Sequence, residues 1–219
     1  KTMFQQMLNA SRAILLRPSV ATFEEYERND LGWATIYIAI STVIAAILGV
    51  ISFLLNRPYL EQQMRDLQDR LNGEPLPAFA TTMMGGQSAT GAIIGGLIFT
   101  LLAFFVWTGL VYLLGRLFGG TGAFGELAYD IALFWAPIAV IRALIGVIAI
   151  GPVAAIGGII GLIVGLYNIY LSWLSVQSGM NLSPGKAAGV IAIPLVVLLL
   201  GCCAIFGALA LAIAGMSQQ

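Results

Sequence analysis

Apolar residues are concentrated in five long blocks along the chain, and most polar residues fall between the blocks. Each block is dominated by Ala, Val, Ile, Leu, Phe and Gly, and each has the roughly 20 residues that a helix needs to cross a bilayer. In lipid a spanning segment must satisfy its own backbone hydrogen bonds, so each block predicts a transmembrane α-helix. The predicted spans are residues 31–55, 91–114, 127–150, 153–176 and 187–214. The expected fold class is therefore all-α, a polytopic membrane helical bundle.

The segment before the first span, residues 1–30, has a different pattern. Between Lys1 and Arg17, apolar side chains recur on one helical face and polar side chains on the other. This pattern is typical of an amphipathic helix that lies in the membrane interface, or of one that packs on the protein's own surface. Pro18 ends this helix, and residues 22–25 have the spacing of a capping box, which predicts a short second helix. The remainder, residues 31–219, is expected to form the five-span membrane domain.

The longest polar stretch, residues 56–86, separates the first two spans. Asn56 can cap a helix and Pro58 suits its first turn, where the missing N–H costs little. Three leucines and Met64 then repeat at helical spacing, and Gly73 suits the C-terminal cap. We therefore expect a helical arm outside the membrane. It is either solvated or laid on the protein, and a partner-binding arm is the alternative.

Charged residues make up 9% of the chain and hydrophobic residues 59%, whereas a soluble domain carries about 25% charged residues. Most of the surface is therefore expected to face lipid or protein. The formal net charge is 0, so no basic tract indicates a nucleic-acid partner.

The distribution of Lys and Arg predicts the orientation, because cytoplasmic segments carry an excess of both. With the N-terminus inside, the inner segments hold Lys1, Arg12, Arg17, Arg28, Arg116 and Lys186, and the outer segments hold Arg57, Arg65 and Arg70. Six against three favours the N-terminus inside and the 56–86 arm outside.

The residue types that usually carry chemistry are scarce. The chain has no His, which removes the commonest general base, metal ligand and haem ligand. Its two cysteines, Cys202 and Cys203, are adjacent inside an apolar span and lack metal-ligand spacing. We therefore expect the protein to have no catalytic, metal-binding or cofactor-binding residues and not to be an enzyme.

The fourth span carries small residues at intervals of four, which let two helix backbones approach closely. This pattern favours helix packing, and a polar path through the bundle that includes Asn168 is the rival interpretation. A weaker stripe on the fifth span could be its complement. The predicted packing residues are Gly157, Gly161 and Gly165 on the fourth span and Ala204 and Ala208 on the fifth.

The third span carries the charges at membrane depth. Glu126 and Asp130 lie one turn apart near its start, and Arg142 lies farther along. Asp130 and Arg142 are 12 residues apart, about 18 Å along a helix, so they pair only if the helix breaks, and Pro137 between them predicts a kink. A charge at this depth is a functional candidate by default. We expect Arg142 to reach the outer surface or to pair structurally, with a transport role as the alternative.

Three segments, taken in order, resemble the Yip family of five-span membrane proteins, which interact with Ypt/Rab GTPases, and in particular its bacterial members. The first is Arg17-Pro18 followed by Phe23. The second is a glycine turn followed by an aromatic and Leu127, leading to a span with a proline. The third is Leu-Ser-Pro-Gly-Lys-Ala before the last span. The residues that carry the likeness are Pro18, Phe23, Gly122, Phe124, Pro137, Ser183, Pro184 and Lys186.

The resemblance implies a polytopic, non-enzymatic membrane protein. Eukaryotic relatives are linked to vesicle traffic and Rab GTPases and carry a long N-terminal cytoplasmic region. Because only 30 residues of this sequence precede the first predicted span, we do not expect a Rab partner. Spans rich in Ala, Gly and Leu, joined by short loops, favour the cytoplasmic membrane of a bacterium.

Two functions remain open. The first is a non-catalytic scaffold, adaptor or accessory subunit of a membrane complex, with lipid and other membrane proteins or further copies of the chain as partners. The second is a small-solute or ion transporter that uses Glu126, Asp130, Arg142 and Asn168 between its helices, although no internal repeat of the kind common in transporters is visible.

Overall fold

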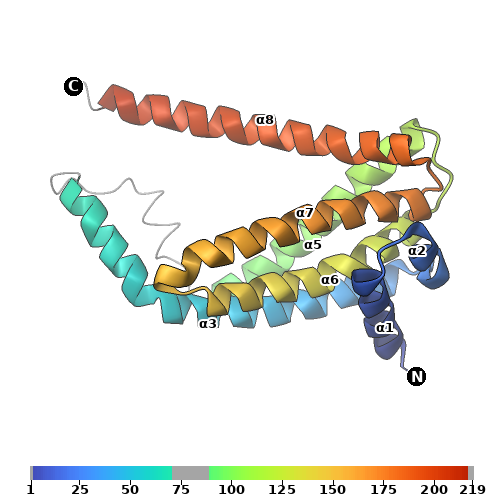
Figure 1. Cartoon of the computed structure of the whole chain (residues 1–219), viewed down its shortest axis with the longest axis horizontal. Coiled ribbons are helices and arrows are strands. Elements are labelled where there is room, and N and C mark those ends of the chain that lie inside the picture. Colours follow the sequence, from blue (N-terminus) through green and yellow to red (C-terminus); the bar gives the residue numbers. More distant parts are fainter. Residues whose placement is uncertain (1, 71–88, 217–219) are drawn as a thin grey trace.

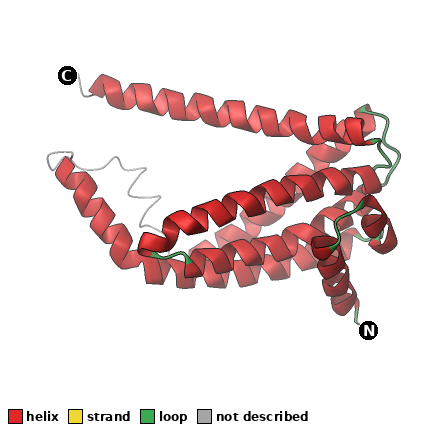
Figure 2. Ribbon diagram, in the orientation of Figure 1, coloured by secondary structure: helices red, strands yellow, loops and turns green. Residues whose placement is uncertain are grey.

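The computed structural model describes residues 2–70 and 89–216, and within these ranges it contains helices and no strand (Figure 2). The elements in chain order are α1 (Met3–Leu16), α2 (Val20–Tyr26), α3 (Leu31–Arg70), α5 (Ala89–Leu117), α6 (Phe124–Ile148), the short 3-10 helix η1 (Gly151–Val153), α7 (Ala154–Gly179) and α8 (Pro184–Met216). Five of them, α3, α5, α6, α7 and α8, are long and apolar enough to cross a membrane. The predicted all-α, five-span membrane fold is confirmed.

The bundle has two dissimilar ends (Figure 1). At one end lie α1, α2 and the two loops 118–123 and 180–183, and we call this the capped end. At the opposite end, which we call the hairpin end, η1 joins α6 to α7. The arrangement follows from five spans whose connections alternate between the two ends.

The packed core lies toward the capped end and is centred on α6. All eight residues from Leu127 to Phe134 are buried, so α6 is covered on every side over two turns. α3 packs along α6, and α7, α5 and α1 also contact it. Phe23 of α2 meets the Phe134 ring edge to face at 6.2 Å. The N-terminal helices are thus part of the core.

α1 packs on the bundle, which is one of the two alternatives left open by its amphipathic pattern. Met7, Ala10, Ser11 and Ile14 are buried, although Leu8 on the predicted apolar face is 45% exposed. Two hydrogen bonds hold the helix: the Ser11 and Tyr37 hydroxyls lie 2.9 Å apart, and the Tyr167 hydroxyl donates to the Leu15 carbonyl at 2.8 Å. The fixed helix orders the entry to the first span.

α2 begins earlier than the capping-box pattern predicts. The cap is Ser19, whose Oγ accepts the Thr22 N–H at 3.1 Å, and Thr22 itself lies inside the helix. At the next junction the Asp30 carboxylate accepts the Trp33 N–H at 3.0 Å. The short polar segment between Tyr26 and Leu31 therefore ends one helix and starts the next.

The predicted helix start at Asn56 is wrong, because α3 continues without interruption to Arg70 and passes through Pro58. The first half of the predicted arm is helical, as expected. In Figure 1 the last part of α3 turns away from the bundle, as a proline that removes one backbone hydrogen bond allows. Arg57 and Glu61 form an exposed ion pair of 2.9 Å on this part. Residues 71–86 lie outside the described residues.

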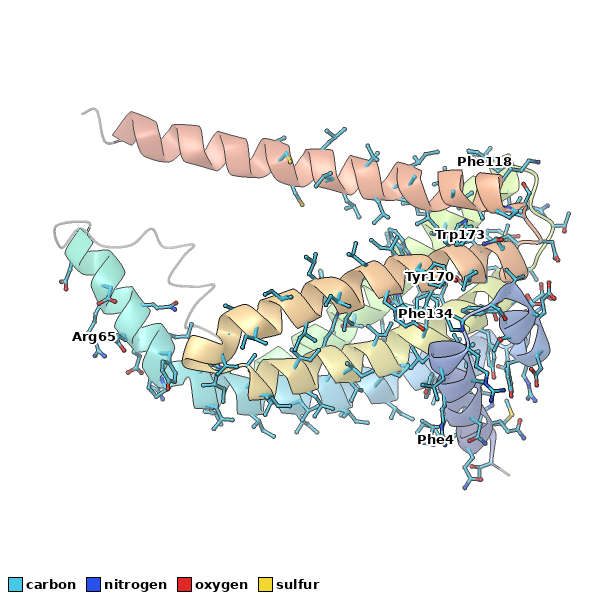
Figure 3. All side chains as sticks on the ribbon, viewed as in Figure 1. Phe4, Arg65, Phe118, Phe134, Tyr170 and Trp173 are labelled. Atoms are coloured by element: carbon cyan, nitrogen blue, oxygen red, sulfur yellow. The ribbon has the colours of Figure 1, made fainter. Side chains whose placement is uncertain are left out.

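Among its described side chains, α8 packs on the bundle through its first part, as far as Leu195. Trp173 donates its indole N–H to the Pro184 carbonyl at 2.9 Å, and a Cβ at Gly189 would lie 3.1 Å from the Phe118 ring (Figure 3). Beyond these contacts α8 diverges from α7 (Figure 1). Every residue from Val196 to Ala204 is exposed, so the predicted complementary contact of Ala204 with α7 does not form. Ala208 also lies on α8, but its side chain is outside the described part.

Candidate functional site

At the capped end, glycines let neighbouring segments of the chain approach one another closely. A Cβ at Gly122 would overlap the carbonyl of Gly179, and the Thr121 N–H donates to the Met180 carbonyl at 3.0 Å. A Cβ at Gly125 would overlap the side chain of Asn29. The loop 118–123 is thus pressed against the end of α7, while the segment before α3 is pressed against the start of α6.

Glu126 has a structural partner at this junction. Its carboxylate accepts the backbone N–H of Ala123 at 2.8 Å, which satisfies a free donor at the N-terminus of α6. The negative charge also lies at the positive end of the helix dipole. This position explains Glu126 by helix capping, without a substrate or an ion.

Asp130 is the least satisfied polar group of the capped end. It is fully buried one turn beyond Glu126, and its Oδ2 lies 3.3 Å from the position of a Cβ at Gly179. The Ser178 hydroxyl lies beside the carboxylate and interacts with it, but no hydrogen bond of standard geometry reaches either carboxylate oxygen. A buried unsatisfied polar group costs roughly 1–3 kcal/mol. Within the described ranges, no three acidic or sulfur side chains are placed to hold a metal ion.

Glu27, which lies outside the membrane-spanning helices, is a second carboxylate in an unfavourable environment. Burial raises the pKa of Glu27, and the nearby carboxylates of Glu126 and Glu24 raise it further. One of its oxygens is buried without a hydrogen bond. The folded protein therefore holds a proton on Glu27 more readily than the unfolded chain does.

This difference predicts a pH-dependent stability. Because the folded state binds the Glu27 proton more tightly, the free energy of unfolding falls as pH rises above the ordinary pKa of 4.5 toward the raised value. We expect Glu27→Gln to increase Tm in detergent at about pH 8 and to leave it near wild type at about pH 4. Glu25→Gln, on the exposed side of α2, is the control and should change neither. Parallel pH profiles for wild type and Glu27→Gln would refute the assignment.

Arg142 is exposed, and its side chain lies beside α7 instead of extending toward the hairpin end. A guanidinium nitrogen lies 3.2 Å from the position of a Cβ at Gly165. Gly165 is 11 residues from Ala154 and 14 residues from Gly179, so it lies near the middle of α7, about 16 Å from the hairpin end. α6 also continues through Pro137 as one helix, which keeps Asp130 about 18 Å from Arg142.

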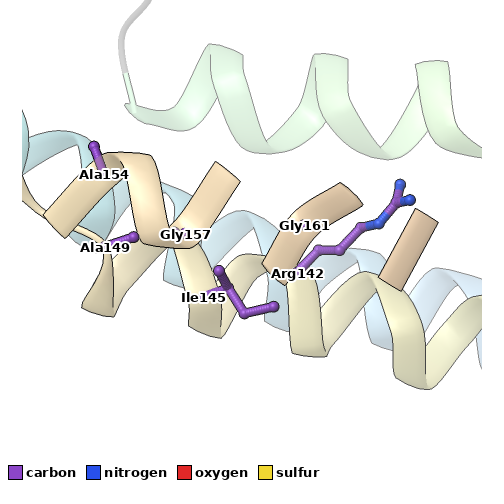
Figure 4. A pocket seen from close by; sticks show the side chains of 7 residues that line it. Arg142, Ile145, Ala149, Ala154, Gly157 and Gly161 are labelled. Carbon is purple, nitrogen blue, oxygen red and sulfur yellow. The ribbon is translucent and has the colours of Figure 1, made fainter. Parts of the chain in front are cut away.

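Arg142, an exposed residue, lines an open pocket of about 530 Å³ between α6 and α7, which we call the cavity (Figure 4). The cavity wall consists of Arg142, Ile145, Gly146, Ala149, Ala154, Gly157 and Gly161. Gly157 lies directly against Ala149, so close helix packing occurs there. At Gly161 the expected close contact is absent, because a Cβ would meet nothing within 4 Å.

Comparison with protein-family models identifies the family of this protein. The Yip1 domain model matches residues 12–206, which is most of the sequence and includes all five spanning helices in whole or in part. The chain belongs to the Yip1 domain family. No curated protein and no solved structure gives a match.

Most of the Yip1-like residues come together at the capped end although they are distant in sequence. Phe23 packs on Phe134, Gly122 on Gly179, and Phe124 on Tyr112 with ring centroids 5.5 Å apart. Lys186 lies close to the glycine turn, with its Nζ 3.6 Å from the position of a Cβ at Gly119. Pro18 and Ser183 are in the connections at the same end, and Pro184 is the first residue of α8. Pro137 lies farther along, inside α6.

The Yip1 domain also holds unpaired polar atoms, of which the sequence indicated only the one on Asn168. The indole nitrogens of Trp107 and Trp135, the Thr108 hydroxyl and the side-chain amide oxygen of Asn168 are buried without hydrogen bonds. Trp107 is 10 residues before the end of α5, and Trp135 and Asn168 are each 11 residues from the capped-end terminus of their helices. They therefore share one depth. A lone Trp or Thr in an apolar block gives no sequence signal for this layer.

Proposed function

We propose that this Yip1 domain is a non-catalytic scaffold or accessory subunit that assembles with other proteins in the cytoplasmic membrane of a bacterium. The observation that carries the proposal is the isolation of α8. From Val196 to Ala204, more than two helical turns, every side chain is exposed on all sides of the helix. Without a hydrophobic driving force in lipid, helices associate through packing contacts, and no described part of the chain covers this segment.

The capped end supports the same role. Its glycine contacts and buried α1 and α2 make a firm base from which α8 extends. Such a base holds one helix at a fixed place in the membrane, as a subunit that positions others requires. The small-solute transporter remains a prediction without a supporting path, because Glu126 serves as a cap and Asp130 is fully buried.

Photo-crosslinking tests the scaffold role. A photoreactive residue at Leu199 of α8, which is 64% exposed, should yield one protein adduct in native membranes at a constant ratio to the chain. The matched site is Leu113 of α5, which is 63% exposed on a helix packed in the bundle, and it should yield lipid adducts. Lipid adducts alone at Leu199 and at Val197 would refute the proposal.

The same proposal includes an orientation, with α1 and α2 in the cytoplasm. We expect single cysteines at Gln62 and Gly185 to react with an impermeant reagent from opposite sides of the membrane, in a background without Cys202 and Cys203. Both positions are exposed, and Gly185 has open space for a side chain. The Gly185 cysteine should react only after the membrane is opened. Reaction of both cysteines from one side would contradict the topology.

A further inference from the structure

The cavity between α6 and α7 contains one charge and is otherwise apolar (Figure 4). That charge is Arg142, whose guanidinium lies beside Gly165 near the middle of α7. An Arg at the centre of a transmembrane helix costs roughly 2.5–3.5 kcal/mol on insertion scales. Among the described residues the only ion pair is Arg57–Glu61, so nothing within these parts of the chain neutralises Arg142.

The described acids of the chain do not supply an anion for Arg142. Asp130 is about 18 Å away along α6 and is completely buried, while Glu126 lies one turn farther and caps the helix. A second copy in the same orientation would hold its own Asp130 and Glu126 near its capped end, at the same membrane depth as the Asp130 and Glu126 of the first copy. A dimer across this cavity would therefore place Arg142 opposite apolar residues of the other copy.

A lipid phosphate is also at the wrong depth. The hydrocarbon core is about 30 Å thick, so phosphates lie at least about 15 Å from the midplane. The guanidinium lies about 16 Å from the hairpin end of α7, close to that midplane. The charge is thus placed for a carboxylate that another helix carries into the membrane.

The surface beside Arg142 suits a helix. Gly161 has no neighbour within 4 Å, and Gly165 has only the guanidinium. Small residues one turn apart let a second helix backbone approach closely. Gly157, by contrast, is already occupied by Ala149. The open part of the glycine stripe and the unpaired charge therefore lie together on one face.

We propose that this cavity is the docking site for a transmembrane helix of another protein, which packs on Gly161 and pairs an Asp or Glu at mid-membrane depth with Arg142. The inference rests on the proposed scaffold function and names the chemistry of one partner. Formation of the pair would offset the insertion cost of both charged side chains. It would also select helices that carry an acid at this depth over plain apolar helices.

Synthetic helices test the docking site directly. The probe is a Leu/Ala helix of about 24 residues with Lys at both ends and one central Glu, and the matched peptide carries Gln in its place. In phosphatidylcholine vesicles, energy transfer from a donor on the full-length protein to an acceptor on the peptide reports association. We expect the Glu peptide to bind at least tenfold more tightly than the Gln peptide, and Arg142→Leu to abolish the difference.

A second pair of variants separates docking from folding. Gly161→Leu fills the cavity without a clash inside the chain, so it should preserve Tm and weaken binding of the Glu peptide at least tenfold. Gly158→Leu is the control, because Gly158 also has open space but does not line the cavity. It should preserve both Tm and binding.

Four outcomes overturn the inference. The first three are equal binding of the Glu and Gln peptides, a Glu preference that persists in Arg142→Leu, and loss of binding in Gly158→Leu. A fourth is displacement of the Glu peptide by phosphatidylglycerol, with that lipid retained by wild type and lost from Arg142→Leu in native mass spectrometry. The occupant is then a lipid headgroup. If the Leu199 crosslink survives any of these results, the scaffold function stands and only this docking site falls.

Discussion

We expect Gly122→Ala to destabilise the protein by about 3 kcal/mol or more, the largest effect of any single methyl group added to it. The added Cβ would overlap the carbonyl of Gly179. Both partners are backbone, so neither side can move by changing a rotamer. The loop 118–123 would have to separate from α7, which would also break the hydrogen bond from Thr121 to Met180.

Melting in one detergent, followed by circular dichroism or by tryptophan fluorescence, measures this effect. Gly185→Ala is the matched control, because Gly185 lies at the same end with open space around it. Ala is favoured over Gly in a helix by about 1 kcal/mol, so the control should melt at or slightly above the wild-type Tm. Equal Tm values for Gly122→Ala and wild type would show that the two loops do not depend on this contact.

The five spans could be predicted from the sequence because lipid leaves the backbone few choices. Blocks of about 20 apolar residues must form helices there, and the predicted spans 127–150 and 153–176 lie within three residues of α6 and α7 at each end. The family likeness was visible for a related reason. Its glycine and proline positions mark turns, and turns have local sequence signals.

The partners of those turns could not be predicted. The sequence indicates a glycine turn at Gly122, but it does not reveal that Gly179, 57 residues later, occupies the space of the missing side chain. The stripe on α7 shows the same limit. Its period places Gly157 and Gly161 on one face, yet Ala149 contacts only the first and leaves the second open. Periodicity identifies a face of a helix, whereas the neighbouring helix decides where that face is covered.

Arg142 shows how tertiary context overrides a general tendency. Long cationic side chains near a helix end usually extend to the membrane surface, and this tendency favoured an outward direction. In the structure, the space beside Gly165 admits the guanidinium at mid-depth instead. Pro58 gives a parallel case at the boundary of the membrane. It suits a helix start by local rules, but α3 continues through it.

Arg142→Leu should stabilise the isolated protein. The substitution removes a charge that costs roughly 2.5–3.5 kcal/mol at the centre of a membrane, and no acid in the described residues loses a partner. Tm in detergent should therefore rise or stay equal to the wild-type value. Arg57→Leu is the comparison, since Arg57 forms an exposed pair with Glu61 whose loss should change stability by about 1 kcal/mol or less.

A lower Tm for Arg142→Leu than for wild type would show that Arg142 has an acidic partner within the chain. If one of the acids between residues 61 and 74 reached back to Arg142, Arg142→Leu would leave that acid as a buried unpaired charge. The protein would then lose about 3–5 kcal/mol of stability. Neutralising Asp66, Asp69 or Glu74 in that variant would then restore Tm, and Arg142 would anchor the arm. Glu61 is the weakest candidate, because it already pairs with Arg57. The alternative is that Arg142→Leu raises the Tm of the isolated protein and also abolishes its preference for the Glu peptide. Arg142 would then be a residue that lowers the stability of the free chain and stabilises only the complex with an acidic partner helix.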